Sequence, residues 1–504
     1  MSDPNSYRQI LRSSSIIGGA SVVNILIGLV RTKVAAVLLG PAGVGLIGLL
    51  QNLMATASTI SALGFGTVGT RQIAEAAGRD DEVAVIAARR ALFWGTMGLA
   101  IVGAGCFWLL RETLSEKVLQ DPGANQQLAW LAVGVALTVA AGAQTALLNG
   151  LRRIGDLARL SISSSLLSTL LGIGALLWCK EAGLLLFVLA APVSSFLLGH
   201  WFVRRLGRVQ APATPLAQIT RQWRTMAKLG VAFMVSGLAV TIGQLAVRTL
   251  IQRDLGPEAL GQFQAAWAIS MTYITFVLSA MGTDYYPRLT AVIHDQEAAR
   301  QLVNEQTEVA LLLAGPVFLA MIGLAPWVID LLYSSAFDQS VTLLRWQVAG
   351  DLLKVASWPL GFVLLAAGDG RTFMCAELVA IGTFVLFTWI GLPILGVQAT
   401  GVGFFIMYAA YLPLAYWLSW RRVRCCWPRH VVALFLLFLT ACGSVFAIAQ
   451  WSERGGGVAG VVLAVAMGVY GLARLGRKAN FNGRLGKIAG VLHQIIQKTG
   501  MYRD

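Results

Sequence analysis

The sequence is poor in charged residues, and this scarcity excludes an ordinary soluble fold. Only 12% of its 504 residues are Asp, Glu, Lys or Arg, whereas a typical soluble domain has about 25%. Hydrophobic residues make up 57% of the chain. The composition indicates a polytopic membrane protein, and we expect an all-α fold.

Motifs for enzymatic chemistry are also lacking. The sequence has no GxxxxGK[ST] loop for nucleotide phosphates, no HExxH metal motif and no GxSxG nucleophile motif. The four histidines are isolated from one another, and the spacing of the six cysteines suits neither zinc nor a disulfide framework. We therefore expect a protein that is not an enzyme, with no catalytic residue, no metal and no cofactor.

What the sequence does contain is a series of long apolar segments. A helix needs about 20 apolar residues to cross a bilayer. Fourteen segments meet this length, near residues 13–39, 44–68, 91–110, 127–150, 160–179, 182–203, 228–252, 258–281, 307–333, 343–367, 372–395, 399–419, 430–449 and 456–474. They predict about fourteen transmembrane helices.

The net charge of +15 is distributed unevenly between the connections. If the N-terminus is cytoplasmic, most Lys and Arg residues fall in connections on the cytoplasmic side, as the positive-inside rule requires. The basic charge is therefore a mark of topology rather than of nucleic-acid binding. We expect a multi-pass protein of the bacterial inner membrane with both termini in the cytoplasm.

An internal repeat links the two halves of the chain. VRTKVAAVLLGPAGVGLIG, from Val30, matches VRTLIQRDLGPEALGQFQ, from Val247, with one extra residue before the Gly-Pro pair. The matched positions are Gly40-Pro41 with Gly256-Pro257, Gly45 with Gly261, and Gly66-Thr67 with Gly282-Thr283. Two parallel six-helix lobes, with a substrate site at their interface, are typical of transporters.

The repeat predicts four regions along the chain. Residues 1–211 form an N-lobe with helices 1–6, residues 212–428 form a C-lobe with helices 7–12, and residues 429–474 form an extra helix pair. Residues 475–504 form a basic cytoplasmic tail, with apolar residues at helical spacing from Leu485 to Ile496. This tail is expected to lie on anionic inner-leaflet lipid as an amphipathic helix. A partner-binding helix is the alternative.

Two arginines lie in equivalent segments of the repeat, Arg31 and Arg248. If the lobes face one another, both guanidinium groups would line a water-filled central cleft whose counter-charge is an incoming anion. The guanidinium fork suits phosphate oxygens. The alternative is that both side chains snorkel to the membrane interface. Lys33 is closer to that interface and is a weaker member of the same set.

Two further charges lie inside the tenth apolar segment, Asp351 and Lys354. Because they are three residues apart, they share a helix face. They either neutralise one another, or they face the cleft, where Lys354 would contact an anionic head group and Asp351 would serve as counter-ion or proton site. Glu377, in the next segment, either couples an ion or makes a structural hydrogen bond.

Other polar residues in or beside the spans are candidates to line the same cavity. They are Asn24, Gln51, Asn52, Gln244, Gln262 and Gln264. For any one of them, a hydrogen bond between helices is the alternative, and it is the commoner role for such residues.

The two lobes, Arg31, the segment LLGPAGVGLIGLLQN and above all LRWQVAGDLLKVASWPLGFVLLAAGDGRTFMCAELV resemble Wzx-type polysaccharide flippases. These proteins belong to the multidrug/oligosaccharidyl-lipid/polysaccharide (MOP) exporter superfamily. The last segment resembles the O-antigen and enterobacterial-common-antigen branch most. The resemblance covers about residues 1–420, and many members of that branch have twelve helices, so the extra pair is a departure.

The resemblance implies translocation of an undecaprenyl-pyrophosphate-linked oligosaccharide, such as an O-antigen repeat unit, from the cytoplasmic to the periplasmic leaflet. Alternating access between the lobes would be the mechanism, and the similar positions are Arg31, Arg248, Asp351 and Lys354. Polysaccharide polymerase and chain-length machinery are the implied protein partners. One alternative is a cation-coupled drug exporter of the same superfamily, which would favour acidic and aromatic cavity residues. Another is a polytopic polymerase or ligase, although these usually need a larger outer loop.

Overall fold

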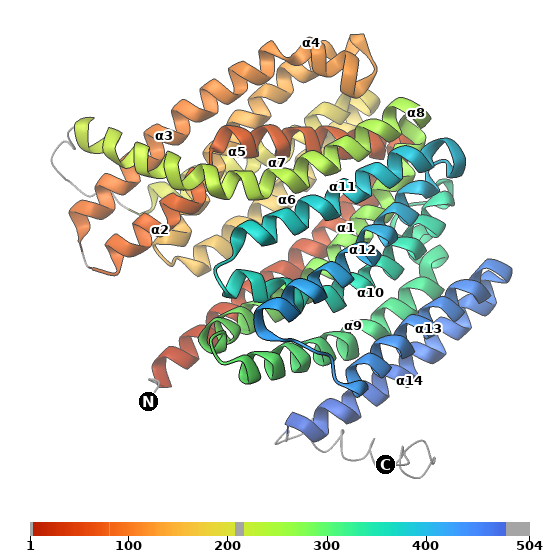
Figure 1. Ribbon diagram of the computed structural model, residues 1–504. Coiled ribbons are helices and arrows are strands. Elements are labelled where there is room, and N and C mark those ends of the chain that lie inside the picture. Colours follow the sequence, from red (N-terminus) through yellow and green to blue (C-terminus); the bar gives the residue numbers. More distant parts are fainter. Residues whose placement is uncertain (1–3, 80, 207–215, 480–504) are drawn as a thin grey trace. The chain divides into compact units, whose positions relative to one another are not determined.

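The computed structural model describes residues 4–79, 81–206 and 216–479, and the regular elements in these ranges are helices (Figure 1). The prediction of an all-α fold is confirmed. The α-helices are α1 (Pro4–Ala62), α2 (Phe65–Ala77), α3 (Glu82–Leu109), α4 (Arg111–Leu114), α5 (Asn125–Gly150), α6 (Ile154–Cys179), α7 (Gly183–Arg204), α8 (Leu216–Val292), α9 (Gln296–Leu332), α10 (Gln339–Ala366), α11 (Gly370–Leu395), α12 (Gln398–Val423), α13 (Arg429–Trp451) and α14 (Glu453–Ala479). The predicted amphipathic helix of the tail falls within residues 480–504 and lies outside the described residues.

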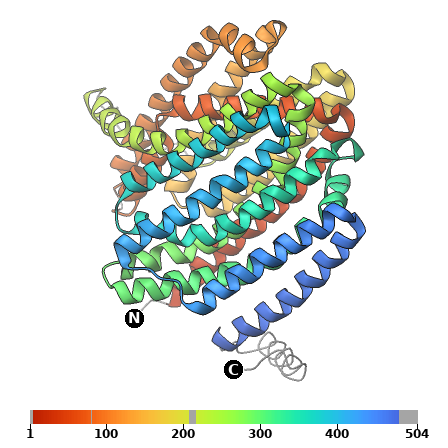
Figure 2. The same cartoon turned by 45° about the vertical axis from the view of Figure 1, so that its right-hand side comes forward.

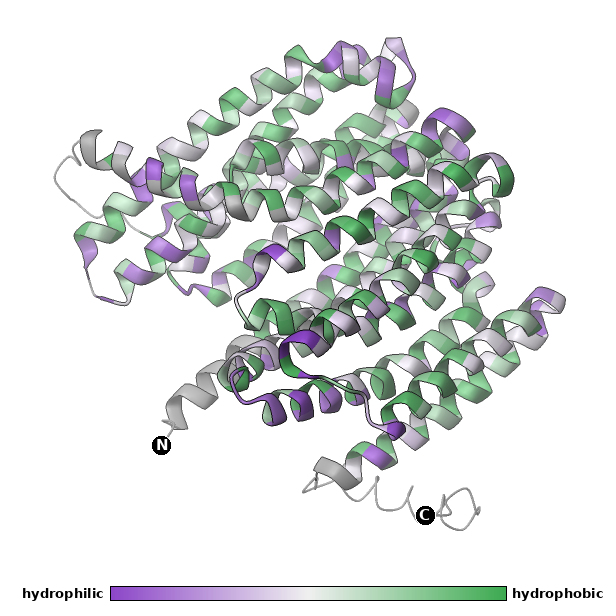
Figure 3. Cartoon of the chain, in the orientation of Figure 1, coloured by the Kyte–Doolittle hydropathy of each residue, from purple (hydrophilic) through white to green (hydrophobic). Residues whose placement is uncertain are grey.

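Within the described ranges, eleven helices are long and apolar enough to cross a membrane: α1, α3, α5, α6, α7 and α9 to α14. Hydrophobic residues run along these helices, and hydrophilic residues gather near helix ends and connections (Figure 3). The chain is therefore a multi-pass membrane protein. The number of fourteen transmembrane helices stays a prediction.

The chain divides into two compact units. An N-terminal unit comprises Met1–Gly261 and Leu332–Ala336, and a C-terminal unit comprises Gln262–Leu331 and Phe337–Asp504. The predicted lobe boundary between residues 211 and 212 rests on the sequence repeat rather than on compactness, and it stays a prediction.

In the N-terminal unit, the core forms where α2, α3 and α5 pack against the first arm of α8, which is the part of this helix before Gly256. Its buried residues include Phe65 and Ile73 from α2, Leu92 from α3, Leu147 from α5 and Met226 from α8. The indole Nε1 of Trp223 donates a hydrogen bond of 2.8 Å to the carbonyl oxygen of Ala91, which fixes α8 against α3. The four helices thus bury their apolar side chains in one shared core.

Two glycines break the longest helices at matching positions of the repeat. Gly40 has φ 61° and ψ −168° inside α1, and Gly256 has φ 82° and ψ −178° inside α8. Positive φ favours glycine because it has no Cβ, and the proline that follows each glycine lacks a backbone N–H to continue the helical ladder. The sequence repeat is thus also a repeat of backbone geometry.

The same two segments contact one another within the N-terminal unit. A Cβ on Gly45 would lie 2.6 Å from the carbonyl oxygen of Pro257, and a Cβ on Gly261 would lie 1.8 Å from that of Pro41. These two contacts are equivalent under exchange of the repeats. Only glycine permits such a close approach of two backbones.

In the C-terminal unit, α10 packs against α12, and α11 packs against α12. The predicted extra pair forms α13 and α14, which run side by side (Figures 1 and 2). Gly456 and Gly460, four residues apart on α14, lie against Gly323 of α9. A Cβ on Gly323 would lie 2.7 Å from the carbonyl oxygen of Gly456 and 2.9 Å from Cα of Gly460. This small-residue packing joins the extra pair to the unit.

Candidate functional site

Arg31 is held by neutral groups inside the N-terminal unit. Its Nη2 donates a hydrogen bond of 2.6 Å to the carbonyl oxygen of Phe187, and its Nη1 donates one of 3.4 Å to Oγ of Ser168. The guanidinium carbon lies 4.3 Å from the centroid of the Phe187 ring, a cation–π contact. These contacts tie α1 to α6 and α7, and none of them neutralises the positive charge.

Arg248 is the more deeply buried of the two repeat arginines, with 3% of its surface exposed. Its Nη1 donates a hydrogen bond of 3.2 Å to the carbonyl oxygen of Gln244, one turn earlier on α8. The Gln244 side-chain oxygen in turn accepts a hydrogen bond of 3.5 Å from Nδ2 of Asn52 on α1. The structure thus brings together three of the predicted residues, Asn52, Gln244 and Arg248.

The remaining predicted residues of this unit lie on the long helix α1. Nδ2 of Asn24 donates a hydrogen bond of 2.7 Å to Oγ of Ser161, so Asn24 links α1 to α6. Lys33 and Gln51 are half-buried. The Asn24 contact is the helix–helix hydrogen bond that was the alternative to a cavity role.

In the C-terminal unit, Asp351 is fully buried and lies at the centre of a polar cluster. Its Oδ2 accepts hydrogen bonds of 2.7 Å from Oγ of Ser270 and 2.5 Å from Oη of Tyr273. Both donors come from the second arm of α8, whereas Asp351 lies on α10. Two hydroxyl donors on one oxygen lower the cost of burying a carboxyl group.

Lys354 is half-buried on the same helix, but its ammonium group has different neighbours. Its Nζ lies 3.9 Å from Sδ of Met271 and 5.6 Å from the centroid of the Tyr408 ring. Among the described side chains, Asp351 and Lys354 form no direct ion pair. The two charges therefore share a helix without joining in one salt bridge.

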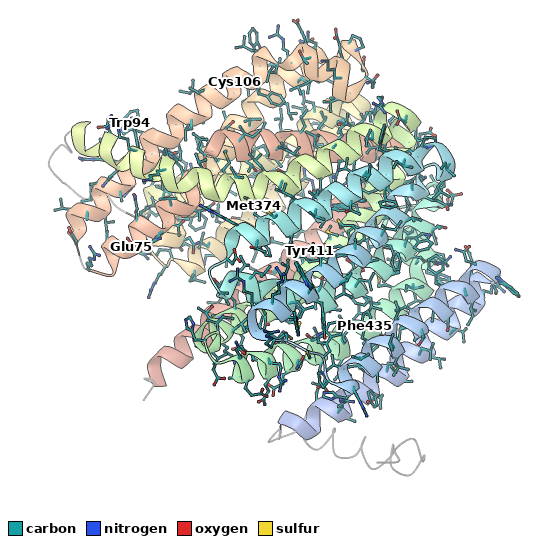
Figure 4. The ribbon with its side chains drawn as sticks, in the orientation of Figure 1. Glu75, Trp94, Cys106, Met374, Tyr411 and Phe435 are labelled. Carbon is teal, nitrogen blue, oxygen red and sulfur yellow. The ribbon has the colours of Figure 1, made fainter. Side chains whose placement is uncertain are left out.

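Glu377 and Gln262 make contacts between helices of the C-terminal unit. Oε1 of Glu377, on α11, accepts a hydrogen bond of 2.9 Å from Oη of Tyr411, a residue of α12 that is labelled in Figure 4. The Gln262 side-chain oxygen accepts from the backbone N–H of Ser340 at 3.0 Å and from its Oγ at 2.7 Å. Gln264 is half-buried on α8.

Sequence reasoning missed the hydroxyl partners of the charged residues, Ser270, Tyr273 and Tyr411. A hydroxyl group in an apolar helix carries little pattern of its own, because it is as common at packing positions as at functional ones. One signal was present: Ser270 and Tyr273 are three residues apart and share a face of the second arm of α8.

A second charge cluster, also missed, is centred on the buried carboxylate of Glu308 and joins the extra helix pair to α9. Glu308 is 3% exposed, and its Oε1 lies 2.6 Å from Nε of Arg474 on α14. Nε2 of His430, on α13, lies 3.4 Å from the other carboxylate oxygen of Glu308. One carboxylate thereby contacts both helices of the pair.

Similarity to known proteins shows the family to which this helical membrane protein belongs. The family described as "Polysaccharide biosynthesis protein" matches residues 10–292, which is more than half of the chain. The chain belongs to the polysaccharide biosynthesis protein family. This membership confirms the resemblance to Wzx-type polysaccharide flippases.

Two curated relatives of this family member are similar over most of their length. The lipid III flippase of Escherichia coli (strain K12) is 22% identical over 421 residues, covering 82% of this chain and 99% of the relative. The lipid III flippase of Shigella flexneri matches with the same identity and coverage. Both are flippases rather than enzymes, in agreement with the prediction that this chain is not an enzyme.

Solved structures show the same fold at low sequence identity. An inward-facing multidrug resistance MATE family transporter of the MOP superfamily matches with a TM-score of 0.67 and 15% identity, covering 80% of this chain and 98% of that chain. The lipid II flippase MurJ, in an inward closed conformation, matches with a TM-score of 0.66 and 10% identity, covering 94% and 100%. The family member described here therefore has the MOP-superfamily fold.

Proposed function

We propose that this protein translocates an undecaprenyl-pyrophosphate-linked oligosaccharide, such as an O-antigen repeat unit, across the bacterial inner membrane. Transport runs from the cytoplasmic to the periplasmic leaflet by alternating access through a cationic central cleft. Both termini are cytoplasmic, and the basic tail binds anionic inner-leaflet lipid. Family membership and the lipid III flippase relatives support the class of cargo.

The observation that carries the proposal is the neutral surroundings of Arg31. A pyrophosphate is too strongly charged to cross hydrocarbon unaided, because burying an unpaired charge is very costly. An arginine whose partners are a carbonyl, a hydroxyl and an aromatic ring keeps its charge available to an anion. Lys354, beside a thioether and a tyrosine ring, is a second, half-buried cation, and the carboxyl groups of Asp351 and Glu377 are close enough to act on its charge.

The first test replaces the two repeat arginines, Arg31 and Arg248, one at a time in a flippase-null strain. We expect Arg31→Ala and Arg248→Ala each to abolish complementation, while immunoblots of membranes show normal protein levels. Arg71→Ala is the matched control, because Arg71 is an exposed arginine paired with Glu75 on α2. Full complementation by both Arg31→Ala and Arg248→Ala would contradict a pyrophosphate-binding role.

The second test exchanges the charges of Asp351 and Lys354. Because Asp351 is bonded to Ser270 and Tyr273 rather than to Lys354, we expect the Asp351→Lys/Lys354→Asp double variant to remain inactive. Recovery of activity in the double variant, relative to either single variant, would mean that the two residues act only as a neutral pair.

A second candidate function is cation-coupled export of small cationic molecules. The observation that favours it is the buried carboxyl group of Asp351, which is a suitable site for a proton or for a cationic ligand. Dye-efflux assays distinguish the two candidates, since an exporter would lower the accumulation of cationic dyes in cells and an Asp351→Asn variant would lose this effect. We expect the wild-type protein to leave dye accumulation unchanged while it complements the flippase-null strain.

A further inference from the structure

A separate cavity lies within the N-terminal unit, between α3, α5 and α7. Its volume is about 650 Å³. This is within the range of about 300–1,000 Å³ that is typical of sites for small ligands. None of the predicted cleft residues is among those that line it.

One end of the cavity is strongly basic. Arg89 and Arg90 on α3 and His200 and Arg204 on α7 line it, and no aspartate or glutamate does. Arg204 is exposed and Arg89 is half-buried, so both charges lie toward the surface of the unit rather than in its core. A ligand with a negative head group would be attracted to this end.

The other end of the cavity is apolar. Phe93 and Met97 follow Arg89 along α3, and Phe196 precedes Arg204 along α7. From Arg89 to Met97, and from Arg204 back to Phe196, each helix rises about 12 Å at 1.5 Å per residue. Since α3 begins and α7 ends at the basic end, both helices change from basic to apolar in the same direction in space.

The floor of the cavity is part of the buried core of the unit. Leu92 and Leu147 line the cavity and also belong to the buried cluster of α2, α3 and α5. Trp94, the α3 residue labelled in Figure 4, is 58% exposed and also lines the cavity. Exposed tryptophans of this kind are typical of the membrane–water interface.

We propose that this cavity binds one anionic phospholipid of the adjacent leaflet, with phosphatidylglycerol as the representative ligand. The head-group phosphate lies between Arg89 and Arg204, and an acyl chain lies against Phe93, Met97 and Phe196. Basic pockets between helices on the cytoplasmic side of a membrane bind anionic head groups in this way. The site is independent of the cargo proposed above, so it stands whether or not the protein flips a lipid-linked oligosaccharide.

The geometry favours a phospholipid over other phosphate-bearing molecules. A free phosphate would use the arginines but would leave the apolar end unfilled. The cavity volume suits a compact head group and part of one chain rather than a long polyprenyl tail with an attached oligosaccharide.

The test measures lipid binding to the purified full-length protein in detergent by native mass spectrometry. Phosphatidylglycerol is titrated onto the wild type, the cavity variant Arg89→Gln/Arg204→Gln, and the control variant Arg79→Gln/Arg205→Gln. The control removes the same charge outside the cavity, since Arg79 is exposed and Arg205 stacks on Trp201. We expect the apparent Kd to rise about tenfold or more in the cavity variant and by less than about twofold in the control.

A third variant, Ala140→Phe, fills the apolar end without changing any charge, and it keeps the test decisive if the double variant does not fold. It is expected to weaken phosphatidylglycerol binding by a similar factor. Equal losses in the cavity and control variants, or unchanged binding in Ala140→Phe, would overturn the proposal. So would tighter binding of undecaprenyl phosphate than of phosphatidylglycerol, or displacement of the lipid by millimolar inorganic phosphate.

Discussion

The two Gly-Pro segments of the internal repeat have the same backbone, but the charges beside them have different surroundings. Gly40 and Gly256 break their helices with similar positive φ angles. Arg31, before the first break, contacts α6 and α7, whereas Arg248, before the second, donates to a carbonyl of its own helix. The repeat is thus retained where backbone geometry requires glycine, and it diverges where side chains bind.

The extra helix pair is the largest difference between the two units, because α13 and α14 belong only to the C-terminal unit. We expect Glu308→Ala to destabilise the protein by about 3 kcal/mol, since it leaves the guanidinium of Arg474 without its buried counter-charge. The measurement is thermal unfolding in detergent. Glu75→Ala is the control: Glu75, labelled in Figure 4, forms an exposed pair with Arg71, and its loss should cost about 0.5 kcal/mol or less. Equal effects of the two variants would show that Glu308 does not hold the pair in place.

The glycine contact between the repeats allows a test of their symmetry. Gly261→Ala should destabilise by about 1–3 kcal/mol, because the new Cβ would meet the carbonyl oxygen of Pro41 at 1.8 Å. Gly45→Ala should have a smaller effect, because its closest backbone atoms lie at 2.6 Å. Gly66→Ala, with no atom within 4 Å of the new Cβ, is the control in the same unfolding assay. A Gly261→Ala protein as stable as the control would show that the contact between the repeats does not require glycine.

The carboxyl clusters of the C-terminal unit can be ranked by burial. Tyr273→Phe removes a hydroxyl donor from fully buried Asp351, and we expect a loss of about 1–3 kcal/mol. Tyr411→Phe removes the donor to Glu377, which is half-buried and so less completely desolvated than Asp351, and the loss should be nearer to about 1 kcal/mol. Equal losses measured by thermal unfolding would mean that burial does not set the difference.

The smallest expected effect concerns helix caps. Hydrogen bonds from the side chain and backbone N–H of Thr372, together with the ion pair to Arg422, hold the pKa of Asp369 below its usual range. Because the carboxyl pKa is lowered in the folded state, its stabilising contribution is present above the unfolded pKa. It is lost as pH falls through the folded value. The difference in melting temperature between wild type and Asp369→Asn should therefore shrink below about pH 4. A difference that does not change with pH would contradict a stabilising role for the charge of Asp369 in the cap and the ion pair.

Much of this architecture could be predicted from the sequence, because apolar length and glycine placement act locally. The apolar segments predicted most of the long helices, and the gaps between segments at residues 39–44 and 252–258 contain the breaks at Gly40 and Gly256. The partners of the charges could not be predicted, since the contact of Asp351 with Tyr273 depends on how α8 packs against α10. The same holds for Glu308, whose partners Arg474 and His430 lie far along the chain.

The broken helices also set the direction in which each repeat arginine points. Arg31 precedes its glycine by one residue more than Arg248 precedes its own. One residue turns an α-helix by about 100°, so relative to the breaks the two guanidinium groups project from different faces. If one residue between Lys33 and Gly40 were deleted, Arg31 would project from its helix in the same direction, relative to the glycine break, as Arg248 does. A single added residue is therefore enough to give two copies of one motif different neighbours.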